Sequence, residues 1–241
     1  MSESIASKIQ EIKQRIHDAC EKAGRDPEEV QLLLATKTVT PERILEAFKT
    51  GEALIAENKI QEVEEKAEAL ANHPHTSHFI GHLQTNKVKF LIKNKVSCLH
   101  SLDRMRLAQR LQNRLEFEDE HMDVLIQVNT SAEKSKFGLK PEEVIDFVKE
   151  VAQMDRLHIK GLMTIGLFSA DLEKVRVCFQ KLSVLKESII AENIPGVEMN
   201  ELSMGMSNDL EVAIEEGATI IRVGTAIFGE RAYSDAYYWP E

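Results

Sequence analysis

Residues 197–228 read VEMNELSMGMSNDLEVAIEEGATIIRVGTAIF and contain two successive units of strand, loop and helix. Residues 197–202 and 219–223 have the length of strands and are expected to form them, and residues 209–216 are expected to form a short helix. A last helix is expected to begin near Thr225. Strands that alternate strictly with helices predict a parallel sheet, because a parallel pair needs a crossover connection.

The same unit recurs upstream along most of the chain. Apolar runs of strand length occupy residues 31–36, 53–56, 77–80, 96–99, 123–128 and 157–163. Helices are expected after them at residues 41–50, 59–71, 84–93, 101–117, 141–154 and 172–192, with Thr40 capping the first and Ser101 or Asp103 the fourth. Eight such units predict an α/β protein with a single (β/α)8 (TIM) barrel domain over residues 1–241. An open doubly wound sheet is the alternative.

An additional helix precedes the eight units. Ile5, Ile9, Ile12 and Ile16 form one apolar stripe at helical spacing, and Gly24 ends the segment. This segment is charged from its start, so it does not have the pattern of a secretory signal peptide. No apolar run in the chain reaches the roughly 18–20 residues that a membrane helix needs.

The composition narrows the class of protein. The chain has 241 residues, with 30 Lys and Arg against 40 Asp and Glu, which gives a net charge of −10. An acidic surface repels nucleic acids and anionic membranes, so we expect neither as a partner. Three cysteines far apart in the sequence fit neither a disulfide framework nor a CxxC metal site. Reduced thiols are typical of a cytoplasmic protein, and we expect a monomer.

Several polar residues follow the predicted strands, where the active site of such a barrel lies. Lys37 follows the first strand, and removal from water makes a lysine amine a better nucleophile toward a carbonyl. Ser207 follows the seventh strand, and Gly224 and Thr225 follow the eighth, where these barrels often bind phosphate. A Schiff-base lysine opposite a phosphate site suggests a phosphorylated aldehyde, of which pyridoxal 5′-phosphate is the common one.

Simpler interpretations of these residues stay open at this point. Lys37 could mark the solvent end of its strand, and Ser207 and Thr225 could be plain helix caps. A hydroxyl group can also serve as a cap and as a phosphate ligand together.

Seven longer segments carry a family resemblance over nearly the whole chain. They are LLLATKTVTPERI (32–44), AENKIQE (56–62), HFIGHLQTNKVK (78–89), LHSLDR (99–104), SKFGL (135–139), GLMTIG (161–166) and ELSMGMSNDLEVAIEEGATIIRVGTAIFGER (201–231). In this order they resemble the YggS/PROSC family of pyridoxal-phosphate-binding proteins, also called PLP homeostasis proteins.

The resemblance implies a barrel of PLP fold type III, related to the barrel of alanine racemase. It implies that Lys37 forms the internal aldimine, that Arg222 faces the pyridine nitrogen and that Asn58 approaches the ring hydroxyl. It also implies phosphate ligands at Ser207, Gly224 and Thr225. The implied role is to hold pyridoxal 5′-phosphate without efficient catalysis, for vitamin B6 homeostasis and for apoenzymes that require the cofactor.

Two positions depart from the usual pattern of the family. Lys59 stands after Glu57 and Asn58, where an aromatic residue is usual. Phe137 stands in SKFGL, where a small or polar residue is common. The first departure affects only the packing around the cofactor ring.

Two alternatives belong to other functional classes: a PLP-dependent amino-acid racemase, and a Schiff-base aldolase without a cofactor. A racemase needs bases on both faces of the substrate. In the racemases that this barrel resembles, the second base is a tyrosine of an additional C-terminal β domain. We expect no such domain here, because the chain ends at Glu241, soon after the last predicted strand. The aromatic residues of the tail are expected to dock it on the barrel; they are Tyr233, Tyr237, Tyr238 and Trp239.

Two further clusters are given ordinary interpretations. The histidines at 73, 75, 78 and 82 lack metal-ligand spacing and have no cysteine near them in the sequence, so no metal is predicted, and His82 is expected in the wall of the site. The lysines at 87, 89, 93 and 95 are interpreted as a solvated helix face, with RNA or DNA contact as the weaker alternative.

Overall fold

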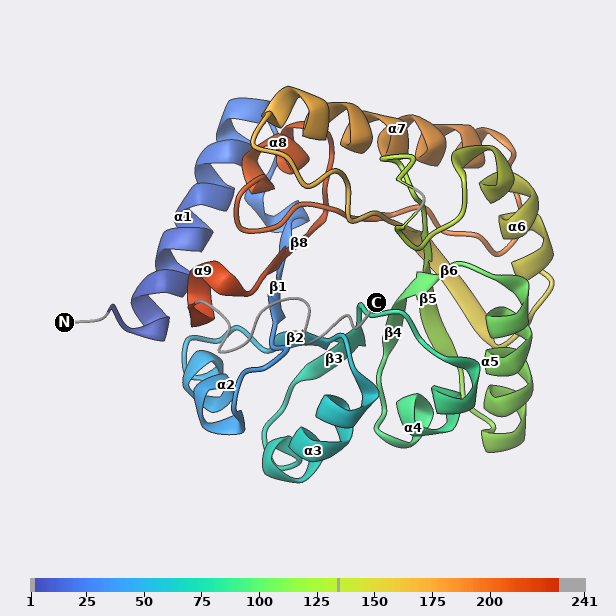
Figure 1. Cartoon of the computed structure of the whole chain (residues 1–241), viewed down its shortest axis with the longest axis horizontal. Helices are drawn as coiled ribbons and strands as arrows, with labels where there is room; N and C mark the ends of the chain where they lie inside the picture. The colour runs from blue at the N-terminus through green and yellow to red at the C-terminus, as the bar shows by residue number, and fades with distance from the viewer. Residues whose placement is uncertain (1–2, 134, 230–241) are drawn as a thin grey trace.

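The computed structural model describes residues 3–133 and 135–229, and its eight parallel strands close a barrel in sequence order. The predicted barrel is therefore confirmed. Figure 1 shows the helices arranged as a ring around the strands. The strands are β1 (Gln31–Ala35), β2 (Leu54–Glu57), β3 (Thr76–Phe79), β4 (Cys98–Leu102), β5 (Met122–Gln127), β6 (Leu157–Met163), β7 (Glu201–Ser203) and β8 (Ile220–Val223).

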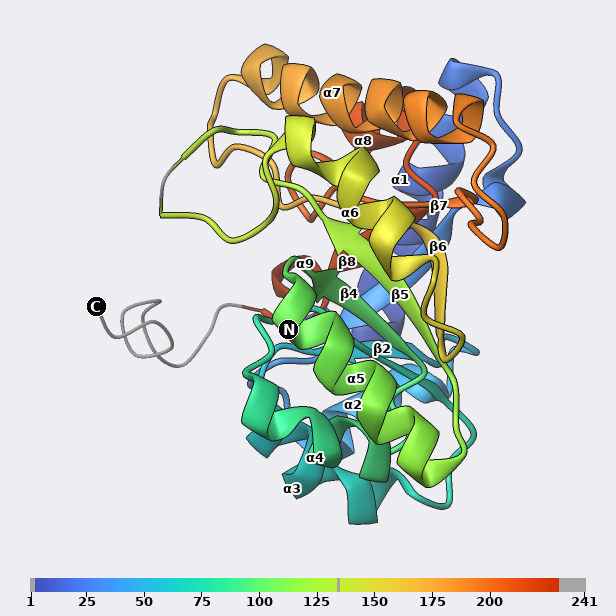
Figure 2. The ribbon, with the colours of Figure 1, turned by 90° about the vertical axis from the view of Figure 1, so that its right-hand side faces the viewer.

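A helix follows each strand on the outside of the barrel (Figure 2). These helices are α2 (Pro41–Phe48), α3 (Ile60–Leu70), α4 (Val88–Lys93), α5 (Met105–Glu118), α6 (Val144–Val151), α7 (Leu172–Ala191), α8 (Leu210–Glu215) and α9 (Thr225–Phe228). No helix among the described residues is long and apolar enough to cross a bilayer.

The additional N-terminal helix α1 (Ile5–Ala23) completes the outer ring. Its four stripe isoleucines are buried, the Ser4 hydroxyl accepts the Ser7 N–H at its start, and Gly24 ends it in the left-handed conformation. α1 packs against α8, α9 and α2 (Figure 1). α9 is a single turn of four residues, and the longer α1 lies beside it in the outer ring, in contact with α8 and α2 as well.

The apolar side chains of the strands fall into two clusters, one on each side of the barrel wall. Leu32 and Leu34 belong to the cluster between the strands and the helices, whereas Leu33 belongs to a separate small cluster inside the barrel. The inner cluster consists of Leu33, Ala56, Cys98, Leu125, Met163 and Ile220. Polar side chains occupy the barrel interior beyond this apolar layer.

Two boundary predictions are wrong in a way that affects the site. β4 extends to Leu102, so His100 and Ser101 lie within the strand instead of following it. The N-cap of α5 is therefore Arg104, and the Ser101 hydroxyl donates to the Gly81 carbonyl oxygen at 2.5 Å. The tail residues Tyr233, Tyr237, Tyr238 and Trp239 lie outside the described residues.

Candidate functional site

Three adjacent strands bring most of the predicted site residues to one part of the barrel mouth. β1 pairs with β8 on one side and with β2 on the other. Lys37 follows β1, Gly224 follows β8, and Asn58 follows β2. Of the two loops predicted to bind phosphate opposite Lys37, the loop after β8 therefore follows a strand next to β1, because closure of the barrel makes the eighth strand the neighbour of the first, and the loop after β7 follows the next strand along.

Close backbone packing joins the end of β8 to the end of β1. A Cβ atom at Gly224 would lie 2.9 Å from the carbonyl oxygen of Ala35, two residues before Lys37. Glycine is therefore needed where the β8 loop passes β1. The Gly224 position also starts α9, whose first residue is Thr225.

The loop after β7 approaches this same turn. The Ser207 hydroxyl accepts the N–H of Ala226, at 3.4 Å, in the first turn of α9. Ser207 is thus not a cap of the following helix α8, whose N-cap is Asp209. Arg15 of α1 donates to the Ser207 carbonyl oxygen at 3.0 Å, which ties the loop to the N-terminal helix. Hydroxyl groups and helix N–H groups converge here, as an anion site requires.

Arg222 lies inside the barrel and is only 5% exposed. Its guanidinium donates to the Ser203 hydroxyl and to the Thr164 carbonyl oxygen, both at 2.8 Å. Burial lowers the pKa of Arg222 to about 10, with partial compensation from Asp209. The side chain is therefore a cation at neutral pH, and both of these hydrogen-bond acceptors are uncharged.

A chain of hydrogen bonds extends from Arg222 across the barrel interior. His100 contacts the Ser203 hydroxyl through Nδ1 at 3.0 Å and His78 Nδ1 through Nε2 at 2.9 Å. Burial lowers the pKa of His78 to about 4, and burial with His78 and Arg222 nearby holds the pKa of His100 well below its usual range. Both rings are therefore neutral at physiological pH. In each neutral ring one nitrogen donates a hydrogen bond and the other accepts one.

Cys98 lies beside the two histidines, and its thiol forms a compact group with their ring nitrogens. The expectation that no cysteine is near these histidines is therefore wrong in space, because pairing of β3 with β4 places Cys98 next to His78. The two rings already satisfy each other by a hydrogen bond, and burial raises the thiol pKa well above its usual value.

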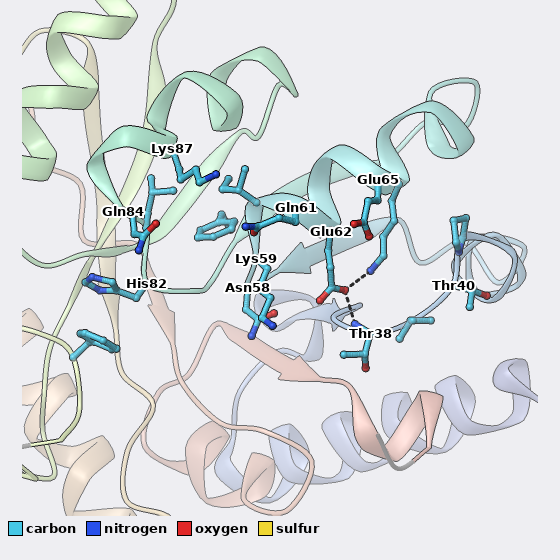
Figure 3. Close-up of a pocket in the computed structure, with 17 residues that line it drawn as sticks. Thr38, Thr40, Asn58, Lys59, Gln61, Glu62, Glu65, His82, Gln84 and Lys87 are labelled. Atoms are coloured by element: carbon cyan, nitrogen blue, oxygen red, sulfur yellow. Dashed lines mark hydrogen bonds and ion pairs between the residues drawn. The ribbon is translucent and has the colours of Figure 1, made fainter. Parts of the chain in front are cut away.

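A cavity of about 990 Å³ opens beside Asn58 at the β2 and β3 ends of the mouth (Figure 3). The Oδ1 atom of Asn58 is buried there without a hydrogen-bond partner among the described residues. A Cβ atom at Gly81 would lie 2.0 Å from the Asn58 carbonyl oxygen, so the β3 loop fixes the backbone of Asn58. A buried amide oxygen without a partner is a position where a ligand can donate.

The two family departures both line this cavity. The ring of His82 stacks on Phe137, with centroids 3.9 Å apart and planes at 17°. His82 thus lines the same cavity as Phe137 and Lys59, and whether this cavity is the cofactor site stays a prediction.

A buried ion cluster near Lys37 was not predicted. Lys66 of α3 contacts Glu57 at 2.7 Å and Glu62 at 2.8 Å. Burial raises the pKa of Glu57 to about 7 although Lys66 and the Thr36 hydroxyl act in the opposite direction. In the sequence, Glu62 and Lys66 have the spacing of an ordinary surface pair on a helix, which gives no signal of burial.

Known proteins resemble this chain over nearly its full length. A family model described as the alanine racemase N-terminal domain matches residues 8–232. The pyridoxal phosphate homeostasis protein of Aquifex aeolicus is 44% identical over 230 residues, covering 95% of this chain and 100% of that protein. The protein of the same name from Escherichia coli is 36% identical over 238 residues, covering 95% of this chain and 98% of that protein.

Two solved structures resemble this chain in fold over more than nine-tenths of its length. PipY of Synechococcus elongatus, solved with PLP bound, has a TM-score of 0.82 at 28% identity and covers 94% of this chain and 100% of that chain. An alanine racemase of Clostridium difficile has a TM-score of 0.73 at 12% identity, covering 92% of this chain and 58% of that chain, and it shares the fold.

Proposed function

We propose, because this chain belongs to the family of pyridoxal phosphate homeostasis proteins, that it binds pyridoxal 5′-phosphate through Lys37 and serves intracellular vitamin B6 homeostasis. The observation that carries the proposal is the packing of Gly224 against Ala35, the last residue of β1, two residues before Lys37. This packing brings the end of β1, which Lys37 follows, next to the turn at the start of α9, where we propose that the phosphate binds. PLP bound to the related PipY chain supports the same ligand.

The residues at the mouth fit the chemistry of this cofactor. When bound, pyridoxal 5′-phosphate supplies an aldehyde, a phosphate, a ring hydroxyl and a pyridine nitrogen. Ser207, Gly224 and Thr225 would bind the phosphate at the start of α9, where the hydroxyl of Ser207 already meets a helix N–H. Asn58 would contact the ring hydroxyl with its buried Oδ1, which has no other partner among the described residues.

Lys37 and Arg222 have separate roles in the proposal. Lys37 supplies the amine that condenses with the aldehyde, forming a C=N bond and releasing one water molecule. Arg222 is a cation without an acceptor atom, so it disfavours a proton on the pyridine nitrogen that it faces. The ring then withdraws electrons weakly, which suits a carrier better than a catalyst.

Borohydride reduction followed by peptide mass mapping tests the covalent attachment. Reduction converts the C=N bond to a stable amine, and we expect the pyridoxyl group on Lys37 in the protein loaded with pyridoxal 5′-phosphate. A label found on Lys136 instead would show that the assignment of the lysine is wrong.

Replacing Ser207 by alanine should weaken the binding of pyridoxal 5′-phosphate by about 10- to 100-fold. A hydrogen bond to a charged group contributes roughly 1.5–3 kcal/mol, and each 1.4 kcal/mol changes affinity tenfold. Equilibrium dialysis of the wild type and the variant measures the change, and Ser188→Ala on the exposed face of α7 is a matched control. Equal affinities would make Ser207 a structural residue only.

The protein loaded with pyridoxal 5′-phosphate should not racemise amino acids at an enzymatic rate. Racemisation requires a proton to leave one face of the α-carbon and to return on the other, and no tyrosine lies among residues 3–133 and 135–229 to act opposite Lys37. The enantiomer ratio of alanine and serine after incubation tests this. Turnover of about 1 s⁻¹ or faster would identify a racemase.

We propose that the protein acts in the cytoplasm as a monomer. Apoenzymes that require pyridoxal 5′-phosphate are the proposed recipients of the bound cofactor. Its three cysteines are free and buried, which suits a reducing compartment.

A further inference from the structure

Lys66 is the only lysine among the buried residues that the structure describes, and it is 7% exposed. Its ammonium group donates to the Thr36 carbonyl oxygen at 2.9 Å, to Glu57 Oε1 at 2.7 Å and to Glu62 Oε2 at 2.8 Å. These three bonds use all three donors of a lysine. Burial of an ammonium group is costly, so such complete pairing is what allows Lys66 to stay inside.

The partners of Lys66 hold the residue before Lys37. Lys66 binds the Thr36 carbonyl oxygen directly, and the Thr36 hydroxyl donates to Glu57 Oε1 at 2.6 Å. Thr36 is completely buried. Its backbone and its side chain are therefore both fixed by the same ion cluster.

The cluster also holds the residue after Lys37. The Thr38 N–H donates to Glu62 Oε2 at 2.5 Å, the same oxygen that accepts from Lys66, and Figure 3 shows this contact. Thr38 has a φ of 65°, a left-handed conformation that is costly for a β-branched residue. An external contact is needed to maintain it, and Glu62 supplies one.

We infer that Lys66, through Glu57 and Glu62, is a positioning residue that fixes the direction in which Lys37 leaves the backbone. The inference rests on the proposed function, because it assumes that Lys37 is the amine that attacks the aldehyde. Because the backbone is held on both sides of Lys37, its side chain leaves the backbone in one direction. The amine is then confined to a narrow range of positions near Ser207, Gly224 and Thr225, which we call the phosphate turn. Displacement of a reacting group by about 1 Å can cost on the order of 100-fold.

Glu62→Ala and Lys66→Met test this role, and a ligand that cannot form the covalent bond separates positioning from phosphate binding. Pyridoxine 5′-phosphate has the same ring and phosphate with an alcohol in place of the aldehyde. In both variants we expect at least about tenfold weaker binding of pyridoxal 5′-phosphate and slower growth of the imine absorption band. Binding of pyridoxine 5′-phosphate should change by less than about twofold, because the phosphate turn does not contact Lys66.

Glu65→Ala is the matched control. Glu65 lies on the same helix (Figure 3), but the hydrogen bonds that hold Thr36 and Thr38 come from Glu57, Glu62 and Lys66. Its replacement should therefore leave the affinity for both ligands and the growth rate of the imine band unchanged. Lys66→Met leaves two carboxylates without their cation and can therefore prevent folding, whereas Glu62→Ala removes only the contact to Thr38 and one ion pair. If Lys66→Met does not fold, Glu62→Ala decides the question.

Unchanged affinity and rate for pyridoxal 5′-phosphate in folded Glu62→Ala would overturn the positioning role. An equal loss of affinity for pyridoxal 5′-phosphate and pyridoxine 5′-phosphate would also overturn the positioning role. The ion cluster would then stabilise the whole barrel mouth and not the Lys37 backbone in particular. Failure of the proposed function has a different signature, because the wild-type protein itself would then show no label on Lys37 after borohydride reduction.

Discussion

Replacing Lys37 by alanine should abolish the imine absorption band of the protein loaded with pyridoxal 5′-phosphate, together with all labelling at this position by borohydride. The C=N bond needs a primary amine, and Lys37 is the residue proposed to supply it. The barrel should remain folded, because Lys37 is only half-buried and its flanking threonines keep their bonds to Glu57 and Glu62. Absorption spectra test the loss of the imine band, mass mapping tests the loss of the label, and circular dichroism tests whether the barrel is folded.

The Lys37→Ala experiment has two useful comparisons. Lys87→Ala removes a lysine that lines the neighbouring cavity, and it should retain the band and the label. Lys37→Ala should still bind pyridoxine 5′-phosphate, because the phosphate turn is intact. An imine band that persists at full intensity in Lys37→Ala would contradict the assignment and would direct attention to Lys136, which reaches the Gly166 carbonyl oxygen at 2.8 Å.

Arg222→Glu should make the bound cofactor a stronger electron sink. A carboxylate in place of the guanidinium would favour a proton on the pyridine nitrogen, and a charged ring withdraws electrons from the α-carbon of an attached amino acid. Loss of the α-hydrogen of alanine in D₂O should therefore accelerate by about tenfold or more, the effect of one favourable charge interaction of about 1.4 kcal/mol. Proton NMR measures this exchange.

Folding must be checked for this variant, since the substitution removes the donor to Ser203 and to the Thr164 carbonyl oxygen. Each unpaired buried group costs roughly 1–3 kcal/mol. Arg222→Gln keeps an amide donor while it removes the cation, and its exchange rate should fall between the wild type and Arg222→Glu. Arg106→Gln on the exposed face of α5 is the matched control. Exchange at the wild-type rate in both Arg222 variants would exclude a contact between Arg222 and the pyridine nitrogen.

The sequence by itself determined the barrel and the neighbourhood of the site. Strand length, helix periodicity and the order of the segments are local properties, and eight strand–helix units leave few ways to bury the apolar face of each strand. Lys37, Gly224 and Thr225 lie within two residues of the ends of their strands, so their place at the mouth needs only the strand ends to be known.

The tertiary structure alone decided which polar side chains are buried and which groups meet. A helix cap at the start of α8 is one interpretation of Ser207 from the sequence. In the structure its hydroxyl instead accepts the Ala226 N–H of α9, because the loop after β7 approaches the first turn of α9. The predicted strand at residues 96–99 would leave His100 just beyond its end, but β4 runs three residues further, so His100 lies within the strand and is buried. Lys66 and Glu62 have the spacing of a surface pair on a helix, and only the tertiary structure shows that Lys66 is buried and that Glu62 accepts the Thr38 N–H beside Lys37. Burial depends on which elements pack together, and a local pattern of residue types does not contain that information.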